Sequence, residues 1–133
     1  MKIDKLDILF SEYVRRRAIK ESGGCERCLT EKHPIEKEDG SAFPAWKQLQ
    51  CSHFYGRAKK TTRYDPDNAT GLCAACHLYL TANPQEHFEF FKKRLGERGL
   101  DLLNHRAHIP QKVDRYLIEL YLKVKIKELE EEE

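Results

Sequence analysis

The 133-residue sequence contains no long apolar run: no stretch approaches the roughly 20 residues that a membrane-spanning helix requires. Its N-terminus carries alternating charge rather than the apolar core of a secretion signal. These two absences predict a cytoplasmic protein. Charged residues make up 35% of the chain, so we expect one compact domain with a modest hydrophobic core, which a bound metal would help to stabilise.

Cysteine is scarce, but four of the five cysteines fall into two Cys-x-x-Cys pairs. The first pair is Cys25 and Cys28, and the second is Cys73 and Cys76. Disulfides are rare in the cytoplasm, whereas thiolates in two short loops supply the tetrahedral set that structural Zn²⁺ prefers. The four residues are therefore predicted zinc ligands. Cys51 is left over, and we expect it to be a buried strand residue rather than a fifth ligand.

Hydrophobic periodicity and turn residues predict a mixture of helices and short strands. A helix is expected over residues 3–21, in which one apolar stripe recurs at helical spacing: Leu6, Leu9, Phe10, Tyr13 and Val14. A loop over 29–45 is expected after the first cysteine pair. A short strand is expected to end at His53, and a second extended segment to follow Asn68. The remaining predicted helices cover residues 73–81, a segment from 84 to about 96 with Asn83 as its cap, 100–104, and 110 to about 130.

The last predicted helix carries a nearly heptad-like apolar stripe. Its members are Val113, Leu117, Leu120, Val124 and Leu129. The first interpretation is that this stripe packs on the N-terminal helix of the same chain. The alternative is that part of it stays exposed and forms the seam of a homodimer.

Two histidines and an asparagine lie between and just after the cysteine pairs, in an arrangement suited to phosphodiester hydrolysis. That reaction needs a base for water, a cation for the phosphate, and a group that aims the base. His53 is the candidate base, because neutral imidazole titrates near working pH. Asn68 is the candidate to orient it through an amide hydrogen bond, and His77 is the candidate ligand of a divalent metal distinct from the zinc. Considered alone, each histidine could equally be a residue that supports the neighbouring cysteine site and has no catalytic role.

The order Cys-x-x-Cys, His, Asn, Cys-x-x-Cys-His resembles that of the HNH, or ββα-metal, nuclease superfamily. More narrowly, the chain resembles the NinG/Rap family of phage recombination endonucleases. The matching stretches are WKQLQCSHF (46–54), TRYDPDN (62–68), LCAACH (72–77) and FEFFKKRLGERGLDLL (88–103). The resemblance implies an endonuclease that uses Mg²⁺ or Mn²⁺ to cut branched DNA, such as Holliday junctions and D-loops, in the cytoplasm of a bacterial or phage-infected host cell. It also implies His53 as general base, Asn68 as its positioning partner and the four cysteines as zinc ligands.

One position departs from the general HNH pattern. Many HNH sites carry Asp immediately before the base histidine, where it binds the catalytic metal, and this chain has Ser52 there. A serine hydroxyl is a weak ligand for Mg²⁺, which prefers carboxylates and water. The catalytic ion is then expected on His77 and Asn68 with phosphate oxygens, or on a substitute carboxylate, for which Asp67 and Asp65 are the candidates. The alternative for both aspartates is ordinary turn chemistry.

A basic run between His53 and Asn68 is the predicted DNA-binding segment. Its four cations, without an intervening acid, are Arg57, Lys59, Lys60 and Arg63. Such a run suits phosphate contacts, and the alternative is a solvated loop. The triplet Arg15-Arg16-Arg17 is interpreted first as a solvated helix face and alternatively as a second backbone contact. No segment resembles a base-reading helix, which favours recognition of DNA structure over sequence.

Together these features predict an α+β protein with a zinc-stapled ββα-metal (HNH) core and helical flanks. The expected parts are an N-terminal helix (1–24), the core (25–82) and a C-terminal helical extension (83–133). The leading functional hypothesis is a metal-dependent endonuclease for branched DNA. The alternatives are an HNH nuclease without branch selectivity and a non-catalytic zinc-knuckle protein that binds DNA.

Overall fold

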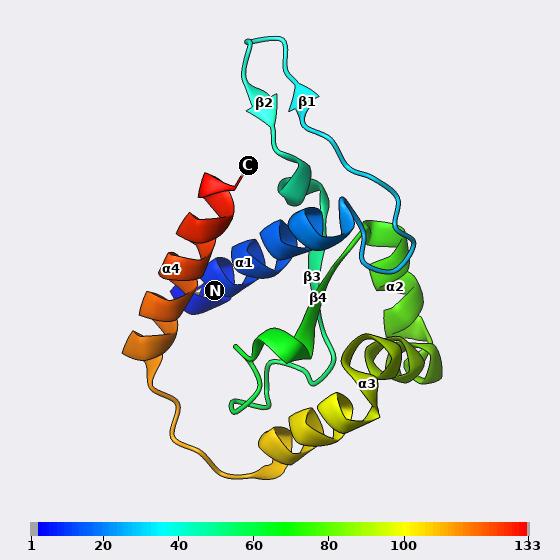
Figure 1. Cartoon of the computed structure of the whole chain (residues 1–133), viewed down its shortest axis with the longest axis vertical. Coiled ribbons are helices and arrows are strands. Elements are labelled where there is room, and N and C mark those ends of the chain that lie inside the picture. The colour runs from blue at the N-terminus through cyan, green and yellow to red at the C-terminus, as the bar shows by residue number, and fades with distance from the viewer. Residues whose placement is uncertain (1–2, 133) are drawn as a thin grey trace.

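The computed structural model describes residues 3–132 and has an α+β architecture, which confirms the predicted class (Figure 1). Its described residues form four α-helices, two 3₁₀ turns and two separate two-stranded antiparallel sheets. In chain order the elements are α1 (Lys5–Ser22), β1 (Ile35–Glu36), β2 (Ala42–Phe43), η1 (Ala45–Gln48), β3 (Gln50–His53), η2 (Pro66–Asn68), β4 (Ala69–Leu72), α2 (Ala74–Ala82), α3 (Pro84–His108) and α4 (Arg115–Glu131). No described helix has both the length and the apolar character needed to cross a membrane.

Helix α1 runs across the β3–β4 hairpin and supplies much of the core (Figure 1). It begins where the Asp4 carboxylate accepts a hydrogen bond from the Leu6 amide at 2.9 Å, and it ends at Gly23, whose φ of 71° favours glycine. The predicted apolar stripe is confirmed, because Phe10 and Val14 are buried against the hairpin and against α4. Helix α1 thus packs against both the β3–β4 hairpin and α4.

Helix α1 and strand β4 approach each other closely where Gly71 meets Ala18. A Cβ atom on Gly71 would lie 2.6 Å from the Ala18 Cβ, so only glycine allows this approach. Nearby, the buried Arg17 guanidinium donates hydrogen bonds to the carbonyls of Pro66 at 2.9 Å and Ala69 at 2.7 Å. The expectation of a solvated face is therefore wrong at Arg17, which joins α1 to the start of β4.

The β3–β4 hairpin separates two environments. Its register pairs Gln50 with Leu72 and His53 with Ala69. Because side chains alternate along a strand, Cys51 and His53 lie on the face toward α1, whereas Gln50 and Ser52 lie on the opposite face, where Gln50 contacts α2. The hairpin thus sends neighbouring side chains of β3 into different layers of the molecule.

The structure corrects the predicted loop and helix boundaries at several points. The expected loop over residues 29–45 contains β1 and β2, which are too short to leave an alternating sequence pattern. Helix α3 is interrupted at Gly96, whose φ of 76° and ψ of 164° are not helical, so the predicted end of the first helix near this residue is confirmed. The second segment is longer than the expected 100–104 helix and reaches His108. Asn83 precedes α3, but its amide donates to the Tyr79 carbonyl at 2.8 Å instead of capping α3. Pro84 does occupy the first turn, as expected.

Helix α4 begins later than expected and buries a different stripe. The Asp114 carboxylate caps it by accepting from the Leu117 amide at 3.1 Å, so residues 110–114 form a connecting segment. The side chains that pack toward α1 are Ile118, Leu122, Ile126 and Leu129. Of the predicted stripe, only Leu129 packs there, whereas Leu117, Leu120 and Val124 are exposed. The hydrophobic periodicity of the sequence thus predicted the helix correctly but assigned the wrong side of it to the contact with α1.

The three predicted parts of the chain can be located on these elements. The N-terminal part contains α1, the central part contains the two sheets and α2, and the C-terminal part contains α3 and α4. Residues 1, 2 and 133, at the outer ends of the first and last parts, lie outside the described residues.

Candidate metal centre and active site

The two Cys-x-x-Cys pairs meet in space, as predicted for a zinc site. The sulfur atoms of Cys25, Cys28, Cys73 and Cys76 all lie within 4.8 Å of one another. The sulfurs of Cys28 and Cys73 are 3.9 Å apart, close to the roughly 3.8 Å between two thiolates of a tetrahedron with zinc–sulfur bonds of about 2.3 Å. A separation of 3.9 Å is far longer than a disulfide bond. The donor set and its dimensions therefore fit structural Zn²⁺.

The turn that carries the first pair is shaped for this purpose. Gly24 pairs with Glu31 in an antiparallel bridge, and a Cβ atom on Gly24 would lie only 2.0 Å from the Thr30 carbonyl oxygen. Leu29 adopts a φ of 60°, and its amide donates to the Cys25 carbonyl at 2.9 Å. This tight turn, with Leu29 in the left-handed conformation, brings the thiols of Cys25 and Cys28 into the same four-sulfur cluster.

The surroundings of the cysteine cluster also suit bound thiolates. The Thr30 hydroxyl lies 3.2 Å from the Cys28 sulfur, and an Arg27 guanidinium nitrogen lies 3.5 Å from the Cys76 sulfur. Both groups can donate to a negatively charged sulfur, and the Thr30 contact is the main reason that the pKa of Cys28 falls to about 6. Cys51 lies elsewhere, in the core beside α1, where burial raises its pKa to about 12. The expectation that Cys51 is not a ligand therefore agrees with its position.

His53 lies at the end of β3, half-buried between α1 and the loop that follows. Its ring packs on Phe10 with 5.5 Å between the ring centroids, and its Nε2 atom is 3.2 Å from the Arg63 carbonyl oxygen. Burial is the largest influence on this ring and lowers its pKa below the ordinary value. The imidazole is therefore neutral at neutral pH, as a general base must be.

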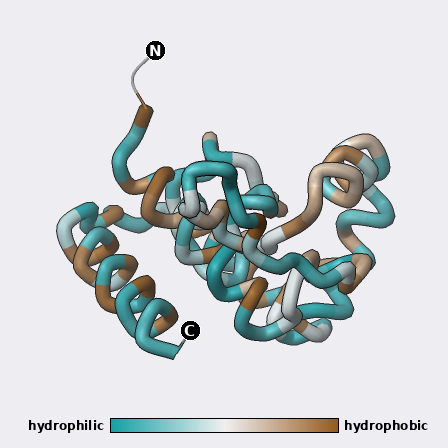
Figure 2. The backbone as a smooth tube through the Cα atoms, turned by 90° about the horizontal axis from the view of Figure 1, so that it is seen from above, coloured by the Kyte–Doolittle hydropathy of each residue, from teal (hydrophilic) through white to brown (hydrophobic). Residues whose placement is uncertain are grey.

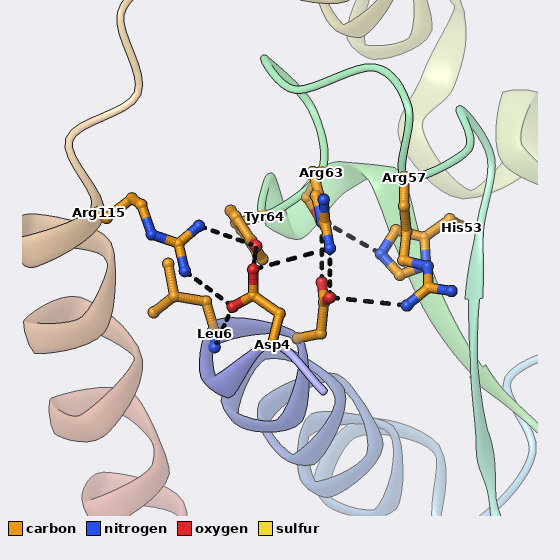
Figure 3. Close-up of polar contacts among 8 residues, drawn as sticks. Asp4, Leu6, His53, Arg57, Arg63, Tyr64 and Arg115 are labelled. Carbon is orange, nitrogen blue, oxygen red and sulfur yellow. Dashed lines mark hydrogen bonds and ion pairs between the residues drawn. The ribbon is translucent and has the colours of Figure 1, made fainter. Parts of the chain in front are cut away.

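An ion-pair network from α1 fixes the loop next to His53, and no local pattern in the sequence predicts it. The Asp7 carboxylate accepts two hydrogen bonds from Arg63, one of them at 3.0 Å from Nε, and lies 3.6 Å from Arg57. Figure 3 shows the neighbouring Asp4 carboxylate between Arg115 and Arg63, with the His53 ring on the other side of Arg63. Helix α1 thus neutralises one edge of the basic segment. Only tertiary structure reveals this, because the partners are 56 residues apart for Arg63 and Asp7.

Asn68 is fully buried and holds the same loop from the opposite side. Its amide oxygen accepts from the Tyr55 amide at 2.8 Å, and its amide nitrogen donates to the carbonyls of Tyr55 and Thr62 at 2.9 and 3.0 Å. The hydrogen bond predicted between this amide and the His53 ring is replaced by an indirect arrangement. Asn68 closes the loop over residues 55–62, and that loop continues to the Arg63 carbonyl that contacts His53.

Replacing Asn68 with alanine is expected to destabilise the fold by about 3 kcal/mol, because two carbonyls and one amide lose their partner in a buried place. Chemical denaturation followed by circular dichroism measures this. Asn83→Ala is the matched control, since Asn83 makes one exposed hydrogen bond, and should cost less than about 1 kcal/mol. Equal effects of the two substitutions would contradict the role assigned to Asn68.

The predicted ligands of a second, catalytic metal do not converge. His77 lies on the first turn of α2, and its Nδ1 atom is 2.7 Å from the Gln50 side-chain oxygen. Gln50 and His53 lie on opposite faces of β3, so the group that His77 contacts is on the other face of the strand from His53. Asp67 pairs with Arg106 at 3.0 Å, and the Asn68 amide is hydrogen-bonded to the backbone of Tyr55 and Thr62. In the described chain, the cysteine cluster is the one group of three or more His, Cys, Asp or Glu side chains that comes within metal-binding range.

The other candidate carboxylate, Asp65, serves turn chemistry, as the alternative interpretation held. It accepts from the Asp67 amide at 3.0 Å and pairs with Arg106 at 2.6 Å. Arg106 therefore binds both aspartates of this turn and joins the end of α3 to η2. These carboxylates are neutralised within the chain, which leaves neither of them free to replace the Asp missing at position 52.

The predicted DNA-binding cations fall into two groups. Arg57, Lys59 and Lys60 are exposed on the loop after His53. Arg63 is half-buried, and its hydrogen bonds with Asp7 raise its pKa above the ordinary value. Arg63 is thus a fixed part of the loop, whereas Lys59 and Lys60 are exposed to solvent.

Comparisons with known proteins add no assignment. No protein-family model, curated protein or solved structure matches this chain. Function must therefore be argued from the residues and their geometry.

Proposed function

We propose that this protein is an endonuclease of the HNH type that hydrolyses phosphodiester bonds in DNA, with a zinc ion as its structural staple and a divalent ion, Mg²⁺ or Mn²⁺, as its catalytic requirement. The sequence resemblance extends the proposal to branched DNA, as in recombination intermediates. The single observation that carries it is the state of His53, a neutral imidazole held at a strand end beside an exposed basic loop.

The hydrogen bond at His53 determines which ring nitrogen can act as a base. A carbonyl oxygen only accepts, so the contact between His53 and the Arg63 carbonyl requires the proton to be on Nε2. The lone pair is then on Nδ1, which is the atom that can take a proton from water. The ring is oriented before substrate arrives, because Asn68 and Asp7 hold the loop that carries this carbonyl.

The residues predicted for the catalytic ion do not form a site, so no step is assigned to that ion. What the chain itself supplies is a base, a fixed loop and cations. Arg57 lies beside His53, and its guanidinium can balance the charge that develops on a phosphate during attack (Figure 3). Lys59 and Lys60 extend the same positive surface along the loop.

Reversing the charge of the loop with Lys59→Glu and Lys60→Glu is expected to weaken DNA binding by at least tenfold at low salt. The dependence of binding on salt should also become flatter, since fewer counterions are released. Fluorescence anisotropy with labelled DNA over a salt series measures both. Lys37→Glu with Lys47→Glu, two exposed lysines outside both the loop and α4, makes the same charge change and should leave binding within about twofold. An equal loss in both double variants would show that net charge, not this loop, attracts DNA.

A non-catalytic zinc protein that binds DNA is the second candidate. Ser52 is buried where many HNH sites have a metal-binding Asp, and His77 contacts Gln50, on the opposite face of β3 from His53. Purified protein should be incubated with branched and linear DNA of equal length, with and without Mg²⁺. Cleavage of branched DNA alone supports the first proposal, and cleavage of both supports a nuclease without branch selectivity. Binding without cleavage under every condition would support the zinc-knuckle alternative.

A further inference from the structure

Helix α4 is apolar on two opposite sides, and one of them is largely exposed in the described chain. At its margin, Tyr121 makes an edge contact with Tyr13 of α1 at 6.4 Å between ring centroids. The side toward α1 is packed, as described above. The other side carries five large side chains that are 45% to 72% exposed: Tyr116, Leu117, Leu120, Tyr121 and Val124. At 100° per residue, this second stripe points away from the first.

The position of α4 leaves this stripe open. Figure 1 shows α4 at the edge of the molecule, beside α1 and connected to α3 by an extended segment. In Figure 2, hydrophobic segments recur along the whole of α4. A soluble chain rarely leaves five neighbouring large apolar side chains of one helix in water, because each would gain free energy on burial.

We propose that this face of α4 binds the same face of a second copy of the chain, in an antiparallel pair with two-fold symmetry. A single stripe can be self-complementary in this way, because a two-fold axis brings each patch onto its own copy. The five side chains would remove on the order of 500 Å² from water on each protomer, or about 1,000 Å² together, which reaches the lower end of specific interfaces. The arrangement stacks four helices in the order α1, α4, α4 and α1.

Charge favours the antiparallel orientation over the parallel one. The C-terminal end of α4 contains Glu128, Glu130 and Glu131. Lys112 lies in the segment just before α4, and Arg115, which also pairs with Asp4 at 2.8 Å, is the first residue of α4. A parallel pair would place the acidic ends side by side, which is unfavourable. An antiparallel pair instead places each acidic end next to the basic start of its partner. This inference does not depend on the proposed nuclease activity, although two catalytic sites in one particle would suit symmetric cutting of a junction.

The oligomeric state of the full chain tests the inference directly. Sedimentation equilibrium over the micromolar range should give a mass that rises to twice that of the chain. Leu117→Glu with Leu120→Glu should keep the mass at that of one chain and leave the circular dichroism spectrum unchanged, because both side chains are exposed in the protomer. Leu78→Glu with Leu102→Glu, two exposed leucines on α2 and α3, is the matched control and should dimerise as the wild type does.

Two results would overturn the proposal: a wild-type protein that stays monomeric throughout this range, or a Leu117/Leu120 variant that dimerises as strongly as the control. Orientation is tested by exchange of charge. Lys112→Glu should weaken the dimer severalfold, and Lys112→Glu combined with Glu128→Lys should restore it. Failure of the combined variant to recover would rule out the antiparallel pairing. These measurements contain no cleavage step, so they stand or fall separately from the nuclease proposal.

Discussion

Replacing Cys76 with serine is expected to abolish zinc binding and, with it, the folded state. Cys76 and Cys25 are both buried, where the turn that carries Cys25 and Cys28 meets β4 and α2. Replacing Cys76 therefore leaves only three sulfur ligands for the zinc ion, inside the core. A structural zinc ion contributes on the order of 10 kcal/mol of apparent binding free energy, which is comparable with the whole stability of a small domain. Metal analysis of the purified protein should give one zinc per wild-type chain and none in the variant, and thermal unfolding should lose its cooperative transition.

Cys51→Ala is the control for this experiment. Cys51 is a partly buried cysteine that packs near α1, outside the four-sulfur cluster. The substitution should keep one zinc per chain and cost only about 1 kcal/mol, since it removes a small side chain from the core. A strong chelator should mimic Cys76→Ser in the wild type. Purified wild-type protein that contains no zinc, yet unfolds cooperatively, would refute the metal assignment.

The second large effect is expected at His53. His53→Ala should lower DNA cleavage by at least about 100-fold, because the reaction loses its general base. Folding and DNA binding should be retained, since the ring is half-buried and its one polar contact is to a carbonyl at the loop edge. Because burial lowers the pKa of His53, the wild-type cleavage rate should fall only below the ordinary histidine pKa of 6.5, as the ring becomes protonated. Single-turnover cleavage over a pH series measures both effects.

Two further histidine variants sharpen this test. His33→Ala removes an exposed ring that contacts Glu31 and should cleave as the wild type does. His77→Ala separates the sequence prediction from the geometry. The original prediction makes His77 a ligand of the catalytic metal, whereas the structure places it beside Gln50 on the opposite face of β3 from His53. A loss in His77→Ala that higher Mg²⁺ rescues would restore the ligand role. Normal cleavage by His53→Ala would remove the base assignment.

Residue patterns within short stretches of the sequence determined the features that depend on neighbouring residues alone: the metal ligands, the helices and the strand that ends at His53. The two Cys-x-x-Cys spacings predicted the zinc ligands, because four thiols in two tight turns have few other uses in such a chain. The periodicity of α1 predicted its buried face, since Phe10 and Val14 recur at helical spacing. The α+β class and the strand that ends at His53 followed from the same kind of signal.

Tertiary structure alone decided which chemical groups meet. Asp7 contacts Arg63 across 56 residues, and no sequence spacing encodes that pair. Helix α4 has apolar residues on two sides, so its sequence could not determine which side packs on α1. The positions of the two histidines also depend on tertiary structure. His53 lies on one face of β3, and His77, on α2, contacts Gln50 on the other face. Backbone direction, and not residue type, determines where each side chain points.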